Sequence, residues 1–168
     1  MSARGKPDML PFCHWLETNS LIVRLDTSIV WSSICEILHY SGFFLVVGST
    51  VIVNLRLMGL AGKKENPSAL AEQLVPWMWI GLGMTIVSGF VLFGGEATDF
   101  YNAITFRIKI LWILVATIVG AIVFRKTRQW GEMPSVPVGA KLVAFISLVL
   151  WIGAILISVE VPAISGVG

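Results

Sequence analysis

Long apolar runs alternate with short polar segments along this chain, and four of the runs are long enough to cross a bilayer. They cover residues 29–55, 76–95, 104–124 and 142–159. A helix needs about 20 predominantly apolar residues to span the hydrocarbon core, where its backbone groups must bond to one another because water is absent. The connections between the runs are short, so consecutive helices are expected to be antiparallel neighbours. The pattern predicts an all-α fold, a polytopic membrane protein with a four-helix bundle.

The residues before the first run have a different pattern. Apolar side chains in 10–25 are mixed with charged ones such as Glu17 and Arg24. This mixture is typical of a short amphipathic helix that lies in the headgroup region instead of crossing the membrane. We therefore divide the chain into an N-terminal tail with an interfacial helix, 1–28, and a transmembrane domain, 29–168.

Composition and charge narrow the class of protein further. Apolar residues make up 56% of the 168 residues and charged residues only 13%, whereas a soluble domain has roughly 25% charged residues. The net charge of +2 is small and its Lys and Arg are scattered, so nucleic acid is not an expected partner. The lipid bilayer is the expected partner, and other membrane subunits are further candidates. Cys13 and Cys35 lack CxxC spacing and are expected to be buried small side chains instead of a disulfide.

Basic residues near the ends of the spans are unevenly divided between the two sides of the membrane. The side with the first and third connections has Arg56, Lys63, Lys64, Arg125, Lys126, Arg128 and Lys141. The other side has Arg24, Arg107 and Lys109, when the remote Arg4 and Lys6 are left out. Because Lys and Arg accumulate on the cytoplasmic side, both termini are expected on the opposite side.

Small residues are frequent in the first two runs and predict close packing between these helices, because helices in lipid associate through small residues and polar bonds. The first run offers Ser41, Gly42, Gly48 and Ser49, and the second has Gly81, Gly83, Ser88, Gly89, Gly94 and Gly95. Trp112 and Trp151 lie deep in the third and fourth runs and are expected to pack between helices.

One polar pair lies inside the first run. Glu36 and His39 are three residues apart and share one side of a helix, and the helical rise places His39 roughly 15 Å from Ile29. An ionised carboxylate in the membrane costs at least about 2.5 kcal/mol, so it should face inward and have partners. We expect a buried polar network of Glu36, His39, Glu96 and Lys109, because the last two belong to the same half of the membrane.

Several roles are open for this network. It can simply hold helices in register in a non-enzymatic membrane component or accessory subunit. It can instead be a proton relay centred on His39. A transition metal could use Glu36, His39 and Glu96, although this ligand set is incomplete, and a haem b could use His39 with Met84 at matching depth. The sequence has no HExxH, CxxC or nucleotide-binding glycine loop, so an enzyme is not favoured.

Several short motifs along the chain have an order and spacing that is found in one known protein family. They are Trp15-Leu16-Glu17, Glu36 with His39, Leu55-Arg56-Leu57 with Gly59, Pro76-Trp77, Ser88-Gly89, Glu96-Ala97, and Phe106 with Lys109. In these motifs the chain resembles, over nearly its whole length, an uncharacterised family of small bacterial four-helix membrane proteins, a domain of unknown function. The resemblance implies a multi-pass protein of the bacterial inner membrane, with its termini then periplasmic, and it implies no activity.

The chain is also distantly similar to membrane proteins of the copper-resistance D type. Their helices place a His before a glycine-containing apolar stretch, as His39 precedes Gly42 and Gly48 here. This chain lacks the further His and Met positions that copper handling would need, so the resemblance does not extend to a copper site.

Overall fold

The computed structural model describes residues 9–62, 64, 66–131, 133 and 135–165, with the backbone alone for 159–165. The predicted tail of residues 1–8, Lys63 and the side chain of Glu160 lie outside this part. The described chain forms seven helices: α1 (Leu10–Thr18), α2 (Ser20–Thr27), α3 (Ile29–Met58), α4 (Pro67–Gly95), α5 (Ala97–Asn102), α6 (Ile104–Gly131) and α7 (Val138–Ser165). The predicted all-helical fold is confirmed, since these ranges contain no strand.

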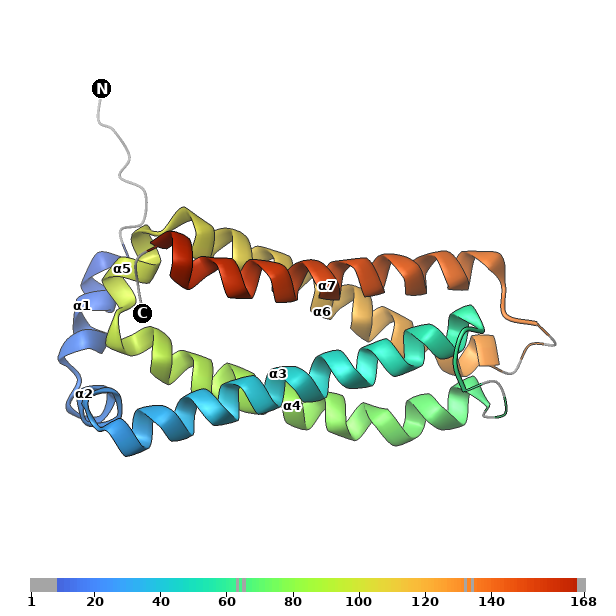
Figure 1. Cartoon of the computed structure of the whole chain (residues 1–168), viewed down its shortest axis with the longest axis horizontal. Helices are drawn as coiled ribbons and strands as arrows, with labels where there is room; N and C mark the ends of the chain where they lie inside the picture. The colour runs from blue at the N-terminus through green and yellow to red at the C-terminus, as the bar shows by residue number, and fades with distance from the viewer. Residues whose placement is uncertain (1–8, 63, 65, 132, 134, 166–168) are drawn as a thin grey trace, which may run out of the picture.

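Four of the helices, α3, α4, α6 and α7, are long and apolar enough to cross a membrane, as predicted. They lie side by side along the long axis of the molecule, and consecutive ones run in opposite directions (Figure 1). The short helices α1, α2 and α5 gather at the end where α3 begins and α7 ends (Figure 1). α3 packs along α4 and α6 along α7, and the two pairs meet where α3 contacts α7 and α4 contacts α6.

The helix of the second run begins earlier than the predicted residue Pro76, because α4 begins at Pro67 and contains Pro76 in its interior. The side chain of Asn66 accepts a hydrogen bond of 2.9 Å from the backbone N–H of Ser68 and caps the helix. Pro67 then occupies a position in the first turn, where its missing N–H is harmless. Pro76 has no N–H to donate to the carbonyl of Glu72 one turn earlier, so α4 tolerates a lost bond there.

The predicted interfacial segment forms two helices where we expected one. Asn19 interrupts it with an extended backbone, φ −69° and ψ 122°, and its side chain accepts from the N–H groups of Leu21 (3.0 Å) and Ile22 (3.4 Å). Asn is among the preferred residues at a helix start because it satisfies N–H groups that have no partner within the helix. The chain therefore turns between α1 and α2.

A small apolar cluster fastens α1 to α5. Cys13, Leu16 and Ala97 are buried in it, and Phe93 and Tyr101 pack against them. Cys13 is a free thiol and buried as expected. The lead segment is thus folded onto the ends of the long helices.

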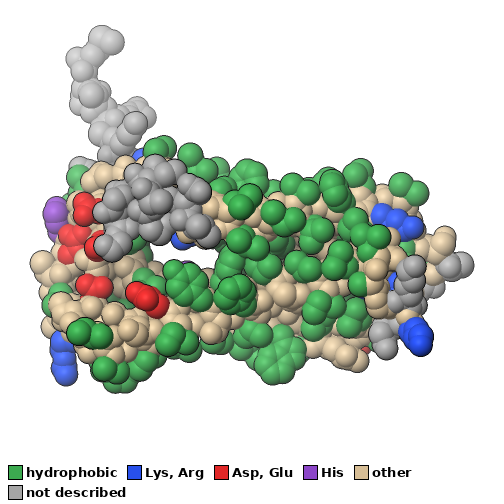
Figure 2. All heavy atoms as spheres, viewed as in Figure 1, with side chains coloured by type: hydrophobic (Ala, Val, Ile, Leu, Met, Phe, Trp, Pro, Cys, Tyr) green, Lys and Arg blue, Asp and Glu red, His purple; other side chains and the backbone are tan. Residues whose placement is uncertain are grey.

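The main hydrophobic core lies mostly in one half of the long helices and extends just past their middle at Ala116 and Ala154. We call the half next to α5 the α5 half, and the other the opposite half. The core residues of the opposite half include Val53, Leu57, Met78, Val123, Phe124 and Ala144. Large apolar side chains are exposed in both halves, such as Ile37 and Ile104 in the α5 half and Ile52 and Ile122 in the opposite half. In the α5 half, Figure 2 shows an opening through the molecule between the α3–α4 and α6–α7 pairs.

Both deep tryptophans pack between helices, as expected. Trp151 is 2% exposed and meets Phe43 edge to face, with ring centroids 6.1 Å apart. Trp112 donates from Nε1 to the carbonyl of Leu150 at 2.8 Å. Its ring lies so close to Gly153 that a Cβ there would be 2.7 Å from Cζ2.

Candidate functional site

A close crossing of α3 and α4 positions the candidate site. A Cβ built on Gly42 would lie 2.6 Å from the carbonyl oxygen of Gly81, and a Cβ on Gly81 would lie 2.6 Å from the carbonyl oxygen of Gly42. The two backbones therefore touch at this point. By contrast, Gly48 and Gly83 would meet nothing within 4 Å, so only some of the glycines predicted to pack do so.

His39 lies one turn from this crossing, with its imidazole ring against α4. Its Nδ1 is 3.0 Å from the carbonyl oxygen of Thr85 and 3.3 Å from Oγ of Ser88. A Cβ on Gly89 would lie 2.7 Å from Cε1 of the ring, so glycine makes room for the histidine. In return, Oγ1 of Thr85 donates to the carbonyl of His39 at 3.4 Å.

These bonds determine which nitrogen of the ring holds the hydrogen. A carbonyl oxygen can only accept, so Nδ1 of His39 must donate to Thr85. The hydroxyl of Ser88 donates to the carbonyl of Met84 at 2.6 Å, so its oxygen is free to accept from the same Nδ1–H. In the neutral ring Nε2 then has the lone pair, and it is the atom that can accept a proton or a hydrogen bond.

Lys109 of α6 lies in the same half of the molecule as His39, the α5 half. Its side chain is half-buried near the start of α6, close enough to His39 for the two charges to interact but without a hydrogen bond to it. The hydrogen bonds of His39 therefore join α3 to α4, whereas Lys109 belongs to the other helix pair.

The two carboxylates of the predicted network lie elsewhere. Glu36 is exposed, and no hydrogen bond or ion pair joins it to His39 or to any other described residue. Glu96 is also exposed, at the end of α4. Partial burial and the neighbouring carboxylates of Asp26 and Asp99 raise the pKa of Glu96. The expected bond between Glu36 and His39 is therefore replaced by the bonds of His39 to α4.

The arrangement of these side chains does not bring together Glu36, His39 and Glu96, the metal ligands considered from the sequence. Glu36 and Glu96 do not converge on His39, and the described residues contain no group of three or more His, Cys, Asp or Glu side chains that could hold a metal ion. The positive charge of Lys109 also opposes a cation near His39.

The haem pair considered from the sequence does not fit either. A porphyrin between His39 and Met84 would have to lie between α3 and α4. The two helices are in contact there, since a Cβ on Gly42 would lie only 2.8 Å from Cβ of Met84. There is no space for a flat macrocycle between these backbones.

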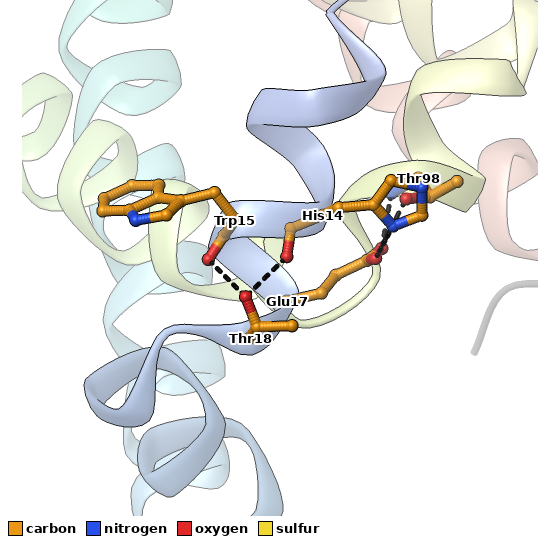
Figure 3. Close-up of polar contacts among 5 residues, drawn as sticks. All are labelled: His14, Trp15, Glu17, Thr18 and Thr98. Carbon is orange, nitrogen blue, oxygen red and sulfur yellow. Dashed lines mark hydrogen bonds and ion pairs between the residues drawn. The ribbon is translucent and has the colours of Figure 1, made fainter.

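A second polar contact, not predicted from the sequence, lies at the end of the molecule and is drawn in Figure 3. Glu17 accepts at Oε1 from the backbone N–H of Thr98 (2.7 Å) and at Oε2 from the Thr98 hydroxyl (2.9 Å). His14 stands 3.5 Å from the same carboxylate. The bond from the backbone of Thr98, in the first turn of α5, lowers the pKa of Glu17. Glu17 thereby joins α1 to α5.

A third polar contact was also missed and lies in the core of the opposite half. Asn54 is fully buried and donates from Nδ2 to Oγ of Ser147 at 3.0 Å, which joins α3 to α7. Its Oδ1 and the Nε1 of Trp151 are buried without a hydrogen-bond partner among the described residues. In the sequence Asn54 stands at the end of the first run and looks like a boundary residue.

Comparison of the chain with protein-family models, with curated proteins and with solved structures finds no match. The resemblance to bacterial four-helix membrane proteins therefore stays a prediction, and function is argued from the site.

Proposed function

We propose that the chain is a multi-pass component of a bacterial inner membrane, a four-helix bundle with both termini periplasmic, which serves as a non-enzymatic accessory subunit. Two observations support this topology. α1 begins and α7 ends at the same end of the molecule (Figure 1). On the face shown in Figure 2, acidic side chains gather at that end, whereas basic side chains appear at both ends.

The accessory role is supported by the surface of the α5 half. Large apolar side chains are exposed along the whole length of the long helices, and in the α5 half Glu36 is exposed among them. A carboxylate on the outer surface of a membrane helix is costly in hydrocarbon. A neighbouring subunit that covers Glu36 with a polar group would remove this cost.

Within the subunit, the first role of His39 is to hold α3 and α4 in register. The observation that supports it is the bond from Nδ1 to the carbonyl of Thr85, made by a ring packed on Gly89. The carbonyl belongs to the partner helix, so a shift of α4 along α3 would break the bond. Interhelical bonds of this kind contribute about 0.6 kcal/mol in membranes, and up to about 1.7 kcal/mol.

A second role, proton handling, is favoured by the tautomer of His39. The Nδ1–H group donates a hydrogen bond to α4, so Nε2 is the basic atom of the ring. A proton accepted there would create a second positive charge near Lys109, and the repulsion between the two would favour movement of the α6–α7 pair or uptake of an anion. Protonation of His39 would thus be coupled to the distance between the two helix pairs.

The variant His39→Asn separates the two roles. The side-chain amide of Asn can place an N–H near the position of Nδ1, but it has no counterpart of the basic Nε2. If the register role is correct, His39→Ala lowers the unfolding temperature of the purified protein in detergent and His39→Asn restores most of the loss. An unfolding temperature that is equal in all three proteins would contradict the register role.

The same variants test proton handling in liposomes. We expect proteoliposomes with the natural chain to dissipate an imposed pH difference faster than empty liposomes, and those with His39→Asn to behave like empty ones although the protein is folded. Equal rates for the natural chain and His39→Asn would eliminate this second role and leave the register role intact.

The proposed topology has its own test. A reporter enzyme fused after Gly168 should be active only if exported, and we expect the periplasmic result. A cytoplasmic result would reverse the orientation without affecting the site.

A further inference from the structure

A groove on the side of the molecule lies between α4 and α6 in the opposite half, away from His39. Its volume is about 190 Å³, and its lining consists of Val75, Met78, Trp79, Ala121, Phe124 and Arg125. Five of the six lining side chains are apolar, and the sixth is a guanidinium group. The groove combines a surface for hydrocarbon with one positive charge.

The burial of the lining residues shows how the groove is oriented. Met78 and Phe124 are each 6% exposed and belong to the core, so they form the floor. Trp79 is 51% exposed and Arg125 is also exposed, so they lie at the rim. The groove therefore opens sideways from the helices, toward the surroundings of the protein, where a membrane-spanning chain meets lipid.

The charge at the rim is available for a ligand. Arg128, one turn farther along α6, is paired with Glu72 of α4 at 3.0 Å. Arg125 forms no ion pair within the described ranges of the chain. It lies near the end of α6 where the basic residues are concentrated, which is the depth at which basic side chains between membrane helices bind anionic headgroups.

We propose that this groove is a binding site for an anionic phospholipid, with one acyl chain against Met78 and Phe124 and the phosphate paired with Arg125. Apolar contact with the floor explains an acyl chain, and the unpaired guanidinium group explains the preference for a negative headgroup. The proposal is independent of the role of His39.

The first test measures lipid binding to the full chain in mild detergent by native mass spectrometry. The probes are phosphatidylglycerol and phosphatidylcholine with identical acyl chains. We expect phosphatidylglycerol to bind at least about fivefold tighter, and this preference to be lost in Arg125→Gln, since one basic residue near a headgroup contributes roughly that factor. Lys126→Gln is the matched control, because it removes the same charge from the next residue, which does not line the groove.

The outcomes separate the alternatives. Equal affinity for the two lipids, or an equal loss in Arg125→Gln and Lys126→Gln, would overturn the proposal, because either result means that no specific site exists. If inorganic phosphate competes as well as phosphatidylglycerol, the groove recognises a free anion and the acyl chain has no part in it. If the chain purifies as a dimer whose contact covers Trp79, a second copy occupies the groove instead.

A second measurement follows the acyl chain directly. Bromine atoms on an acyl chain quench nearby tryptophan fluorescence, and the difference between the natural chain and Trp79→Phe isolates the contribution of Trp79. In phosphatidylcholine vesicles with a small fraction of brominated lipid, we expect Trp79 to be quenched more by brominated phosphatidylglycerol than by brominated phosphatidylcholine. Equal quenching would show that no anionic lipid is retained there.

Discussion

The contact between Gly42 and Gly81 leads to the sharpest prediction. Gly81→Ala adds one methyl group whose carbon would stand 2.6 Å from the carbonyl oxygen of Gly42 and 2.7 Å from Cβ of Leu45. Ordinary contacts begin at 3.4 Å. The first of these neighbours is backbone and cannot rotate away, so α3 and α4 must separate by about 0.8 Å at the crossing.

The cost can be estimated from two opposing effects. Forcing an extra methyl group into a packed contact costs about 1–3 kcal/mol, and replacing glycine with alanine inside a helix gains about 1 kcal/mol. We expect Gly81→Ala to lower the free energy of unfolding by up to about 2 kcal/mol, and by about 1–3 kcal/mol relative to a variant that gains the same helix propensity without the clash. Separation of the helices would also lengthen the bond between His39 and Thr85, now 3.0 Å.

Gly83→Ala is the matched control in the same helix, because its Cβ would meet nothing within 4 Å. It keeps the gain in helix propensity without the clash, so this variant should be as stable as the natural chain or more stable by up to about 1 kcal/mol. On α3, Gly42→Ala and Gly48→Ala form the corresponding pair, since Gly48 is also open.

The assay is reversible unfolding in mixed micelles with increasing SDS, followed by tryptophan fluorescence and far-UV circular dichroism. The informative quantity is the difference between Gly81→Ala and Gly83→Ala, which cancels the common change in helix propensity. If the two variants unfold at the same SDS fraction, α3 and α4 do not cross at these glycines and the position of His39 must be reconsidered.

Three further predictions concern the polar contacts. The pKa of Glu17 is lowered in the folded chain, so the contact of Glu17 with α5 stabilises the fold above the unfolded-state pKa and is lost as the pH falls through the folded-state pKa. Glu17→Gln should increase the rate of amide hydrogen exchange in α1 at neutral pH, after correction for intrinsic rates. An unchanged rate would contradict the contact. The pKa of Glu96 is raised in the folded chain, so the free energy of unfolding should fall as the pH rises from the unfolded-state pKa of Glu96 toward its folded-state pKa. Glu96→Gln should therefore raise the unfolding temperature at pH 7. A lower unfolding temperature for this variant would contradict the repulsion between Glu96 and its neighbouring carboxylates. Ser147→Ala leaves the buried amide of Asn54 without its bond and should cost about 1–2 kcal/mol in SDS unfolding, whereas no loss would show that the amide finds another partner.

The spans could be predicted from the sequence because the hydrocarbon core sets a length that apolar runs must meet. The starts of α3 at Ile29 and α6 at Ile104 agree with the predicted runs. The start of α4 could not be predicted from apolar length, because Asn66 and Pro67 begin the helix among polar residues. Pro76 resembles a first-turn residue but lies in the interior.

The polar network was only partly predictable, because a sequence gives the angle between two residues of one helix but not the rotation of that helix in the fold. Glu36 and His39 are separated by about 60° around α3. This angle is enough for His39 to face α4 while Glu36 is exposed. Because this rotation is not given by the sequence, the glycines that pack between helices could not be identified either. Glu17 and Thr98 are 81 residues apart, so no local sequence pattern could predict their contact.

The one-sided placement of the core has a consequence for how the two helix pairs are held together. Where Leu57 and Phe124 interlock with their neighbours, the helix pairs are fastened to each other. The α5 half contributes fewer buried core residues, so parting the pairs there costs less than global unfolding. The two helix pairs are therefore held together less firmly beside α5 than at the ends where the α3–α4 connection lies.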